Sequence, residues 1–381
     1  MDRALMKHHK KNKLFKLLHG FILPIMTMMS CAVLHAQPIK IGIAGSFSGA
    51  NKAIGAQHWQ GASQAAEDIN QQGGIDGNKI ELINADDGCD DVVAEKVAKR
   101  LVDSQVVAVV GHTCSGASLA ASKIYSEANT LMITPSSTDP KVTDQGFKTI
   151  FRTCGTNDKQ ATVGASFINE KLKAKNIAII YVNIPYSSNL ASATKDNLTK
   201  RGVNIALYES ITLGQWDISR LLDKIKNANP DVIYFAGMYQ DAGNFLKKLR
   251  QQEIQSTFFS GDSIATADFV QIAGGPSIVK DVYMTFSEHT SNSDAKNVIS
   301  RFKDKRIDAE GYTLNAYAAV QAIALAIKQT GSRDVNKLQS WLHSNKVDSV
   351  IGQLEWDSKG DLKNYPFIIY QWNDDGEFEP Y

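Results

Sequence analysis

Short apolar runs alternate with longer segments of helical periodicity along almost the whole chain. In the first part, these patterns predict strands at 39–44, 79–84, 106–110 and 131–134 and helices at 56–71, 92–102 and 115–128. The helix at 56–71 shows the periodicity well, because Ala62, Ala65, Ala66 and Ile69 fall on one face. Such alternation is typical of an α/β protein with parallel sheets, which bind ligands at the carboxyl ends of their strands.

A second series of the same kind begins after residue 155. It predicts helices at 158–172, 188–201, 218–225 and 241–251 and strands at 176–181, 204–210, 231–235 and 257–259. Later segments predict a strand at 282–286, helices at 294–302, 314–329 and 335–343, and a last strand at 367–372. The length of 381 residues suits two domains, and no low-complexity linker separates the halves. We therefore expect two lobes joined by ordinary crossovers of the chain.

The first 36 residues differ in kind from the rest. Six basic residues lie between Arg3 and Lys16, and an apolar segment at 17–33 follows, interrupted by Gly20 and Pro24. A basic start, a short apolar segment and a small residue at Ala36 predict a secretory signal peptide that is cleaved after Ala36. The alternative is a lipoprotein site at Cys31, although the segment before it lacks the usual leucine.

Export changes the charge of the protein. Loss of the six basic residues and Asp2 leaves 35 Lys and Arg against 39 Asp and Glu, a net charge of −4 instead of +1. Without a basic patch or an interleaved aromatic and basic run, nucleic-acid binding has no electrostatic support. The composition, 43% hydrophobic and 21% charged, is that of ordinary soluble globular proteins.

The chain contains four cysteines, of which Cys31 lies in the predicted signal peptide. Cys89 and Cys114 both follow predicted strands and are the plausible disulfide pair in an oxidising compartment, while Cys154 stands alone. Two buried thiols at 89 and 114 are the alternative. No CxxC pair and no Cys/His cluster with zinc spacing occurs, so we expect neither a metal site nor a cofactor.

Motifs of the common enzyme classes are missing from the sequence: there is no GxSxG elbow, Walker A loop, GxGxxG or HExxH. Gly261-Asp262-Ser263 is the nearest approach to a hydrolase motif, but it lies far along the chain and no Asp-x-x-His follows it. His112 is more simply a structural loop residue than a base. We therefore do not expect an enzyme.

Two polar loops follow neighbouring predicted strands. Gly111-His112-Thr113-Cys114-Ser115-Gly116 places a hydroxyl and free N–H groups at a helix start, and the loop at 134–138, TPSST, repeats this after the next strand. Helix N-termini and hydroxyls attract anions, so both loops suit a carboxylate. Simple N-capping by Ser and Thr is the alternative for either loop alone.

Further segments extend the pattern: GGIDG at 73–77, DDGCD at 86–90, GHTCS at 111–115, LMITP at 131–135 with Thr138, and GQLEWDSKGD at 352–361. With these segments the chain, from about Ile39 to Trp372, resembles the periplasmic leucine/isoleucine/valine-binding proteins of branched-chain amino acid uptake systems. The resemblance implies a type I periplasmic binding fold of two Rossmann-like lobes, each a parallel sheet flanked by helices, joined by three hinge crossovers.

The resemblance also implies a ligand site. Ser115 and Thr138 would hold the α-carboxylate of an amino acid, assisted by the backbones of Ser136 and Ser137. The ammonium would meet Asp262, where leucine-binding relatives carry Glu. A turn residue is the alternative for Asp262.

The same resemblance places aromatic residues around the ligand. Tyr186 would close over it and Tyr312 would line the side-chain pocket, although both could equally be core aromatics. Ile54 and Met238 occupy positions that are aromatic in those relatives, which puts the side-chain preference in doubt.

The implied lobes consist of residues 37–155 plus 286–355 and residues 156–285 plus 356–381, with crossovers near Gly155, 285–287 and Trp356. The implied function is capture of a branched-chain amino acid by lobe closure and delivery to a membrane ABC permease from the periplasm, by a monomer. An amide- or urea-binding protein of the same fold and a ligand-sensing receptor are the alternatives.

Overall fold

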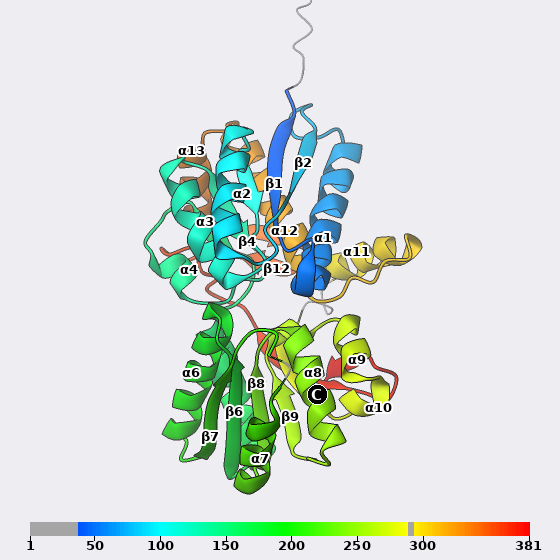
Figure 1. Ribbon diagram of the computed structural model, residues 1–381. Helices are drawn as coiled ribbons and strands as arrows, with labels where there is room; N and C mark the ends of the chain where they lie inside the picture. The colour runs from blue at the N-terminus through cyan, green and yellow to red at the C-terminus, as the bar shows by residue number, and fades with distance from the viewer. Residues whose placement is uncertain (1–36, 216, 289–292) are drawn as a thin grey trace, which may run out of the picture. The chain divides into compact units, whose positions relative to one another are not determined.

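The computed structural model describes residues 37–215, 217–288 and 293–381. The predicted signal peptide at 1–36 and the alternative lipoprotein site at Cys31 lie outside the described residues. Two sheets organise the described chain, and we call each sheet with its helices a lobe (Figure 1). No helix in the described ranges is long and apolar enough to cross a membrane.

The first sheet is fully parallel, with the strand order β2-β1-β3-β4-β5. Its strands are β1 (Ile39–Gly45), β2 (Ile80–Asp86), β3 (Ala108–Val110), β4 (Leu131–Thr134) and β5 (Ile150–Arg152). Helices α1 (Lys52–Gln71), α2 (Asp91–Asp103), α3 (Ser115–Glu127) and the short α4 (Lys141–Asp144) follow the first four strands in turn.

Both faces of the first sheet are covered, which explains why its central strands β3 and β4 are buried at every position and almost wholly apolar. Ile41 and Ile43 of β1 belong to the core shared with α1 and α12 (Thr313–Thr330). Val109 and Met132 point to the opposite face and pack with Leu101 of α2 in a second core. Side chains alternate across a strand, so a strand between two helical layers needs apolar residues at every position.

The second sheet has the order β14-β13-β10-β9-β8-β6-β7. Its parallel part consists of β6 (Asn176–Val182), β7 (Asn204–Ile211), β8 (Val232–Ala236), β9 (Thr257–Ser260) and β10 (Tyr283–Ser287). Strands β13 (Phe367–Trp372) and β14 (Phe378–Pro380) add an antiparallel edge to this otherwise parallel sheet.

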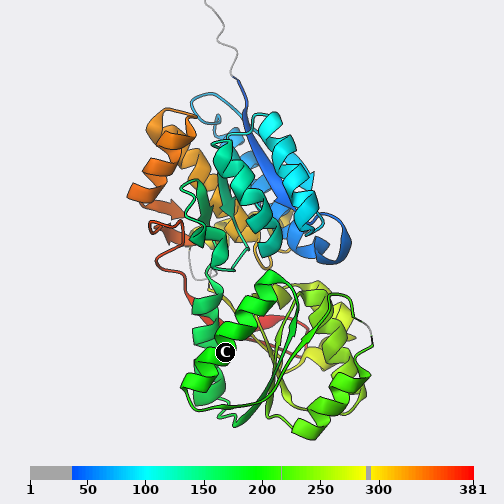
Figure 2. The ribbon, with the colours of Figure 1, turned by 60° about the vertical axis from the view of Figure 1, so that its left-hand side comes forward.

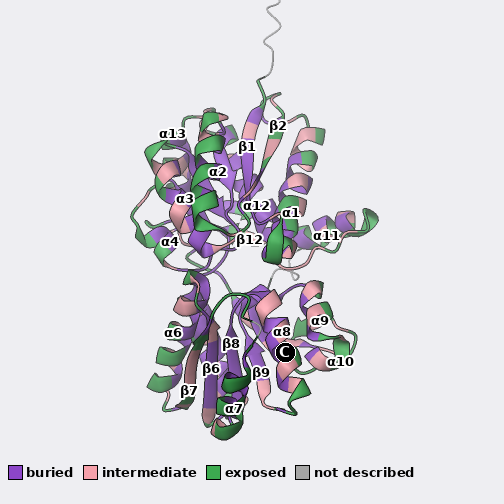
Figure 3. Ribbon diagram, in the orientation of Figure 1, coloured by how far each residue is buried: buried purple, intermediate pink, exposed green. Residues whose placement is uncertain are grey.

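Helices lie on both faces of the second sheet (Figure 2). They are α5 (Asn157–Glu170), α6 (Pro185–Lys200), α7 (Ser219–Ala228), α8 (Tyr239–Gln251), α9 (Ala267–Ala273) and α10 (Pro276–Val279). The central strands β6, β8, β9 and β10 are mostly buried, whereas exposed residues gather on the outer faces of the helices (Figure 3).

In the described residues the chain passes between the two sheets three times: after β5, after β10, and between β12 (Gly352–Leu354) and β13. Helices α11 (Ser293–Asp304), α12 and α13 (Val335–Ser344) and the hairpin of β11 (Val347–Ser349) with β12 lie between the last two passages. Trp356 donates a hydrogen bond to the carbonyl of Arg152 and packs edge-on against Phe151 of β5. Trp356 also forms an isolated antiparallel bridge with Leu362. We therefore propose that the third crossover follows Leu362 rather than Trp356.

Candidate ligand-binding site

The loops after strands of both sheets enclose one cavity of about 320 Å³. The carboxyl ends of parallel strands are where open α/β sheets bind ligands, and the observed lining agrees with that rule. In the described chain the lining follows β1 to β4 in the first lobe and β6 to β9 in the second, with Tyr312 added from the start of α12. The residues are Asn51, Ile54, Cys89, Asp90, Asp91, Val92, Thr113, Cys114, Ser115, Gly116, Ser136, Ile184, Pro185, Tyr186, Leu213, Met238, Asp262, Ser263 and Tyr312.

The first-lobe wall contains the start of helix α3. Ser115 is the first residue of α3, so the unpaired N–H groups of the helix start lie beside its hydroxyl. The hydroxyl of Ser115 accepts a hydrogen bond from the backbone N–H of Asp139 (3.3 Å). Ser136 donates to the carbonyl of Thr113 (2.7 Å) and so ties the two polar loops together. Hydroxyls and helix N–H groups can hold a carboxylate without a basic side chain.

Ser137 and Thr138 do not line this cavity. The resemblance implies both at the site, Ser137 through its backbone. The hydroxyl of Ser137 points into the protein, where it donates to the carbonyl of His112 (3.1 Å) and pairs with Ser118 (2.8 Å). Thr138 is fully buried, and its hydroxyl has no hydrogen-bond partner among the described residues. The structure thus brings Ser115 and Ser136 to the cavity and leaves the other two side chains behind it.

Arg152, at the end of β5, holds the loop that carries Ser136 in place. Its guanidinium is fully buried, donates to the carbonyls of Ser137 (2.5 Å) and Asp139 (3.2 Å), and forms an ion pair with Asp361 (2.6 Å). Arg152 was not predicted, because it belongs to a strand of only three residues, too short to show a periodicity.

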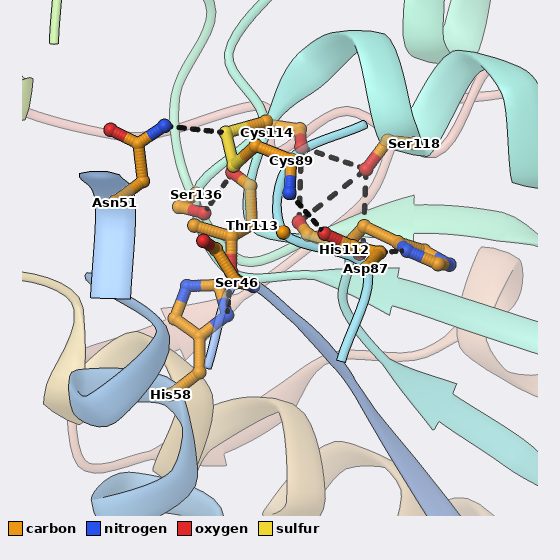
Figure 4. The surroundings of a disulfide bond; sticks show 12 residues. Ser46, Asn51, His58, Asp87, Cys89, His112, Thr113, Cys114, Ser118 and Ser136 are labelled. Atoms are coloured by element: carbon orange, nitrogen blue, oxygen red, sulfur yellow. Dashed lines mark hydrogen bonds and ion pairs between the residues drawn. A yellow bond between two sulfur atoms is a disulfide. The ribbon is translucent and has the colours of Figure 1, made fainter. Parts of the chain in front are cut away.

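The predicted disulfide between Cys89 and Cys114 is present, with Cα atoms 5.4 Å apart, and both cysteines line the cavity (Figure 4). Behind it, His112 bonds through Nδ1 to the carboxylate of Asp87 (2.6 Å) and through Nε2 to the hydroxyl of Tyr125 (3.0 Å). All three side chains are buried, and burial, followed by the charge of Asp87, raises the pKa of Tyr125. His112 is therefore a structural residue.

A buried carboxylate stands in the wall of the cavity. Asp262 follows β9, and its two oxygens accept hydrogen bonds from the hydroxyls of Tyr186 (2.6 Å) and Tyr312. Tyr186 belongs to α6 of the second lobe, whereas Tyr312 directly precedes α12, which packs on the first sheet. Burial raises the pKa of Asp262, while the two hydrogen bonds oppose that rise.

Ile54 and Met238 both line the cavity, as the resemblance implies, and Leu213 and Ile184 add apolar surface from the second lobe. Thr113, from the predicted polar loop at 111–116, also lines the cavity, as do Asn51, Asp90 and Asp91. The last three were not predicted as site residues, because a residue type at a loop position does not indicate where its side chain points.

The described lining includes the carboxylates of Asp90, Asp91 and Asp262 and no Lys, Arg or His. Burial, then the neighbouring charges of Asp90 and Asp87, raises the pKa of Asp91. A ligand with a cationic group suits this electrostatic environment. Ser263, the serine of the hydrolase alternative, donates to the carbonyl of Gly237 (2.5 Å), a backbone contact that activates no nucleophile.

The chain is similar over nine-tenths of its length to known amino acid binding proteins. The chain is 42% identical over 358 residues to an amino acid binding protein of Pseudomonas aeruginosa, covering 93% of this chain and 96% of the relative. It is 34% identical over 343 residues to the Leu/Ile/Val-binding protein of Escherichia coli, covering 90% and 92% of the two chains.

Solved structures agree on the fold. The branched-chain amino acid transporter substrate binding protein of Streptococcus pneumoniae, solved in complex with isoleucine, superposes with a TM-score of 0.83 at 27% identity and covers 90% of this chain and 98% of its own. A leucine binding protein of Thermotoga maritima gives a TM-score of 0.84 at 25% identity, with 90% and 97% of the chains covered.

Residues 38–377 match the sequence family of periplasmic binding proteins. With relatives above 30% identity over nine-tenths of the chain, the two-lobed fold predicted from the sequence is confirmed, as is the absence of an enzymatic role. The chain therefore belongs to the periplasmic binding protein family.

Proposed function

We propose that this protein captures a free amino acid, with branched-chain side chains among its ligands, and delivers it to a membrane ABC permease. The observation that carries the proposal is the pairing of two features in one cavity. Ser115 and the start of α3 offer donors to a carboxylate, and Asp262 offers a buried acceptor to an ammonium. An α-amino acid carries both groups, so it suits both walls.

Several sequence-based expectations support the same function and stay proposals. Export through a signal peptide cleaved after Ala36 would place the monomeric protein in the periplasm, where a permease can receive its ligand. Ser137 and Thr138 would contribute through their backbones or after a rearrangement of the loop. Closure of the lobes would be the signal to the permease, since each lobe supplies one half of the clamp.

The relatives support the side-chain class. One curated relative is named a Leu/Ile/Val-binding protein, and one solved structure holds isoleucine. Ile54, Met238 and Leu213 give this cavity an apolar surface that can contact an aliphatic side chain. Burial of such a side chain contributes about 1.5–3 kcal/mol.

Calorimetric titration of the mature chain, refolded from denaturant to remove any bound ligand, tests the proposal. The titrants are the twenty amino acids, urea and small amides. We expect Leu, Ile or Val to bind. Binding of amides alone would favour the amide-binding alternative, and no response to any amino acid would refute the proposal.

A further inference from the structure

Asn51 lines the cavity with an amide that the fold leaves incompletely paired. The residue is 6% exposed, its Nδ2 lies 3.9 Å from the sulfur of Cys114, and its Oδ1 has no hydrogen-bond partner among the described residues (Figure 4). A disulfide sulfur is only a weak acceptor. An exchange of the two amide atoms would therefore still leave one strong hydrogen-bonding group without a partner.

Asn51 lies directly before α1, but it does not cap this helix. The residue ends a short 3-10 turn, Gly49–Asn51, that runs directly into α1, and its side chain makes no capping hydrogen bond. The amide instead faces the disulfide that forms part of the cavity wall. Helix capping therefore does not account for an asparagine at this place.

Two neighbouring polar side chains on the same wall are paired within the protein. Thr113 accepts from the backbone N–H of Ser46 (3.2 Å), and Ser136 donates to the carbonyl of Thr113 (2.7 Å). Asn51 thus keeps hydrogen-bonding capacity for a ligand, in addition to Ser115 and Asp262. Since the proposed function already assigns the ligand's carboxylate to Ser115 and its ammonium to Asp262, the group that meets Asn51 belongs to the ligand's side chain.

We propose that Asn51 supplies a hydrogen-bond acceptor to the side-chain pocket, so that the protein also binds neutral polar amino acids shaped like the branched-chain ones. This inference rests on the proposed function. Threonine matches valine in shape, and asparagine matches leucine, but each carries a donor for Oδ1. An aliphatic ligand displaces water from Asn51 without replacing its hydrogen bond, whereas a donor-bearing isostere replaces it.

The test compares these isosteres in calorimetric titrations of the mature protein and of two variants. In the unmodified protein we expect threonine to bind within about tenfold of valine, and asparagine within about tenfold of leucine. Asn51→Leu, which removes the acceptor at nearly constant shape, should raise the threonine-to-valine ratio of Kd by about tenfold or more. Asn51→Asp is the matched control, because it keeps an acceptor oxygen. Its threonine-to-valine ratio of Kd should stay below that of the Asn51→Leu variant.

Three titration results would contradict the proposed role of Asn51. If Asn51→Leu weakens valine and threonine equally, the amide meets the ammonium or carboxylate and the inference is wrong. If the unmodified protein binds valine and leucine and rejects threonine and asparagine by more than about a hundredfold, the inference fails while the proposed function stands. If none of the four amino acids binds, both proposals fail. Retained valine binding by Asn51→Leu shows that this variant is folded.

Discussion

Asp262 is a buried carboxylate held between two tyrosine hydroxyls from different lobes. Its raised pKa shows that burial disfavours the charge. A ligand ammonium placed beside it would stabilise the ionised form. A ligand with a positive group should therefore bind more tightly here than a neutral one. The two tyrosines orient the carboxylate before the ligand arrives.

Replacing Asp262 by Asn should weaken amino acid binding by about 2–5 kcal/mol, because the ammonium would lose its buried counter-charge at almost unchanged shape. Calorimetric titration measures the loss. Asp231→Asn serves as the control, since the Asp231 carboxylate accepts backbone hydrogen bonds from Lys175 and Asn176 at the start of β6, away from the cavity lining. Unchanged affinity in Asp262→Asn would mean that the ammonium binds elsewhere.

His58 makes the stability of the folded protein depend on pH. It is fully buried beside the hydroxyl of Thr113 (3.4 Å), and burial, followed by the charge of His112, lowers its pKa from 6.5 to about 3. Between these two values the unfolded chain binds a proton that the folded protein excludes. The contribution of His58 to stability is therefore complete above pH 6.5 and declines as the pH falls towards 3.

We predict that His58→Gln flattens this pH dependence. The free energy of unfolding of the unmodified protein should decline more steeply, by up to roughly 1.4 kcal/mol per pH unit, than that of the variant below pH 6.5. Urea unfolding between pH 4.5 and 7 checks this. Parallel curves for the two proteins would show that His58 does not titrate as inferred.

The limits of sequence reading at the residue scale are visible in the polar loops. Their residue types indicate a carboxylate site, but Ser136 faces the cavity while Ser137 faces the core. Consecutive residues in a loop have no fixed period, so only the backbone path decides which side chain faces the ligand. Asn51 was not predicted as a cavity residue for the same reason.

At the scale of elements, the long and strongly periodic segments were predictable. Helix α12 is mostly apolar and mostly buried because it packs between other elements, and its predicted range at 314–329 falls inside the observed Thr313–Thr330. Strands β5, β11, β12 and β14 have three residues each and were not predicted. Three residues are too few to establish a period of two, and their pairing depends on distant partners.

Strand β5 shows what such a short element can contribute. Its last residue, Arg152, links the loop behind the cavity to Asp361 in the segment before β13. Arg152→Gln should lower the free energy of unfolding by about 3–5 kcal/mol, because it leaves the Asp361 carboxylate and several carbonyls without their partner. Denaturant unfolding measures the change.

The matched control for Arg152 lies in the same segment. Lys359 pairs with Asp144 at the surface, with both side chains largely in solvent, so Lys359→Gln should leave the free energy of unfolding unchanged. Equal effects of the two substitutions would show that the buried pair has no special role.

The disulfide acts at the scale of the whole molecule. It closes a loop of 25 residues that includes β3, so its removal should lower the free energy of unfolding by about 3 kcal/mol. The double variant Cys89→Ser, Cys114→Ser tests this by urea unfolding. Equal stability would contradict the prediction.

Alkylation tests the same bond chemically. Mass analysis of the unfolded protein should find two further alkylated thiols only after reduction. In the folded protein Cys154 should resist alkylation, because burial raises the pKa of its thiol to about 12.

The cavity draws its lining from loops that follow strands of both sheets. A bound ligand therefore stabilises the folded state of both lobes against unfolding, by about 2.7 kcal/mol when its concentration is a hundred times Kd. Unfolding of either lobe must first release the ligand. We expect the melting temperature and the protease resistance of both lobes to rise together with ligand concentration; a rise confined to one lobe would contradict this. The lifetime of the protein in the cell would then follow the nutrient supply that it samples.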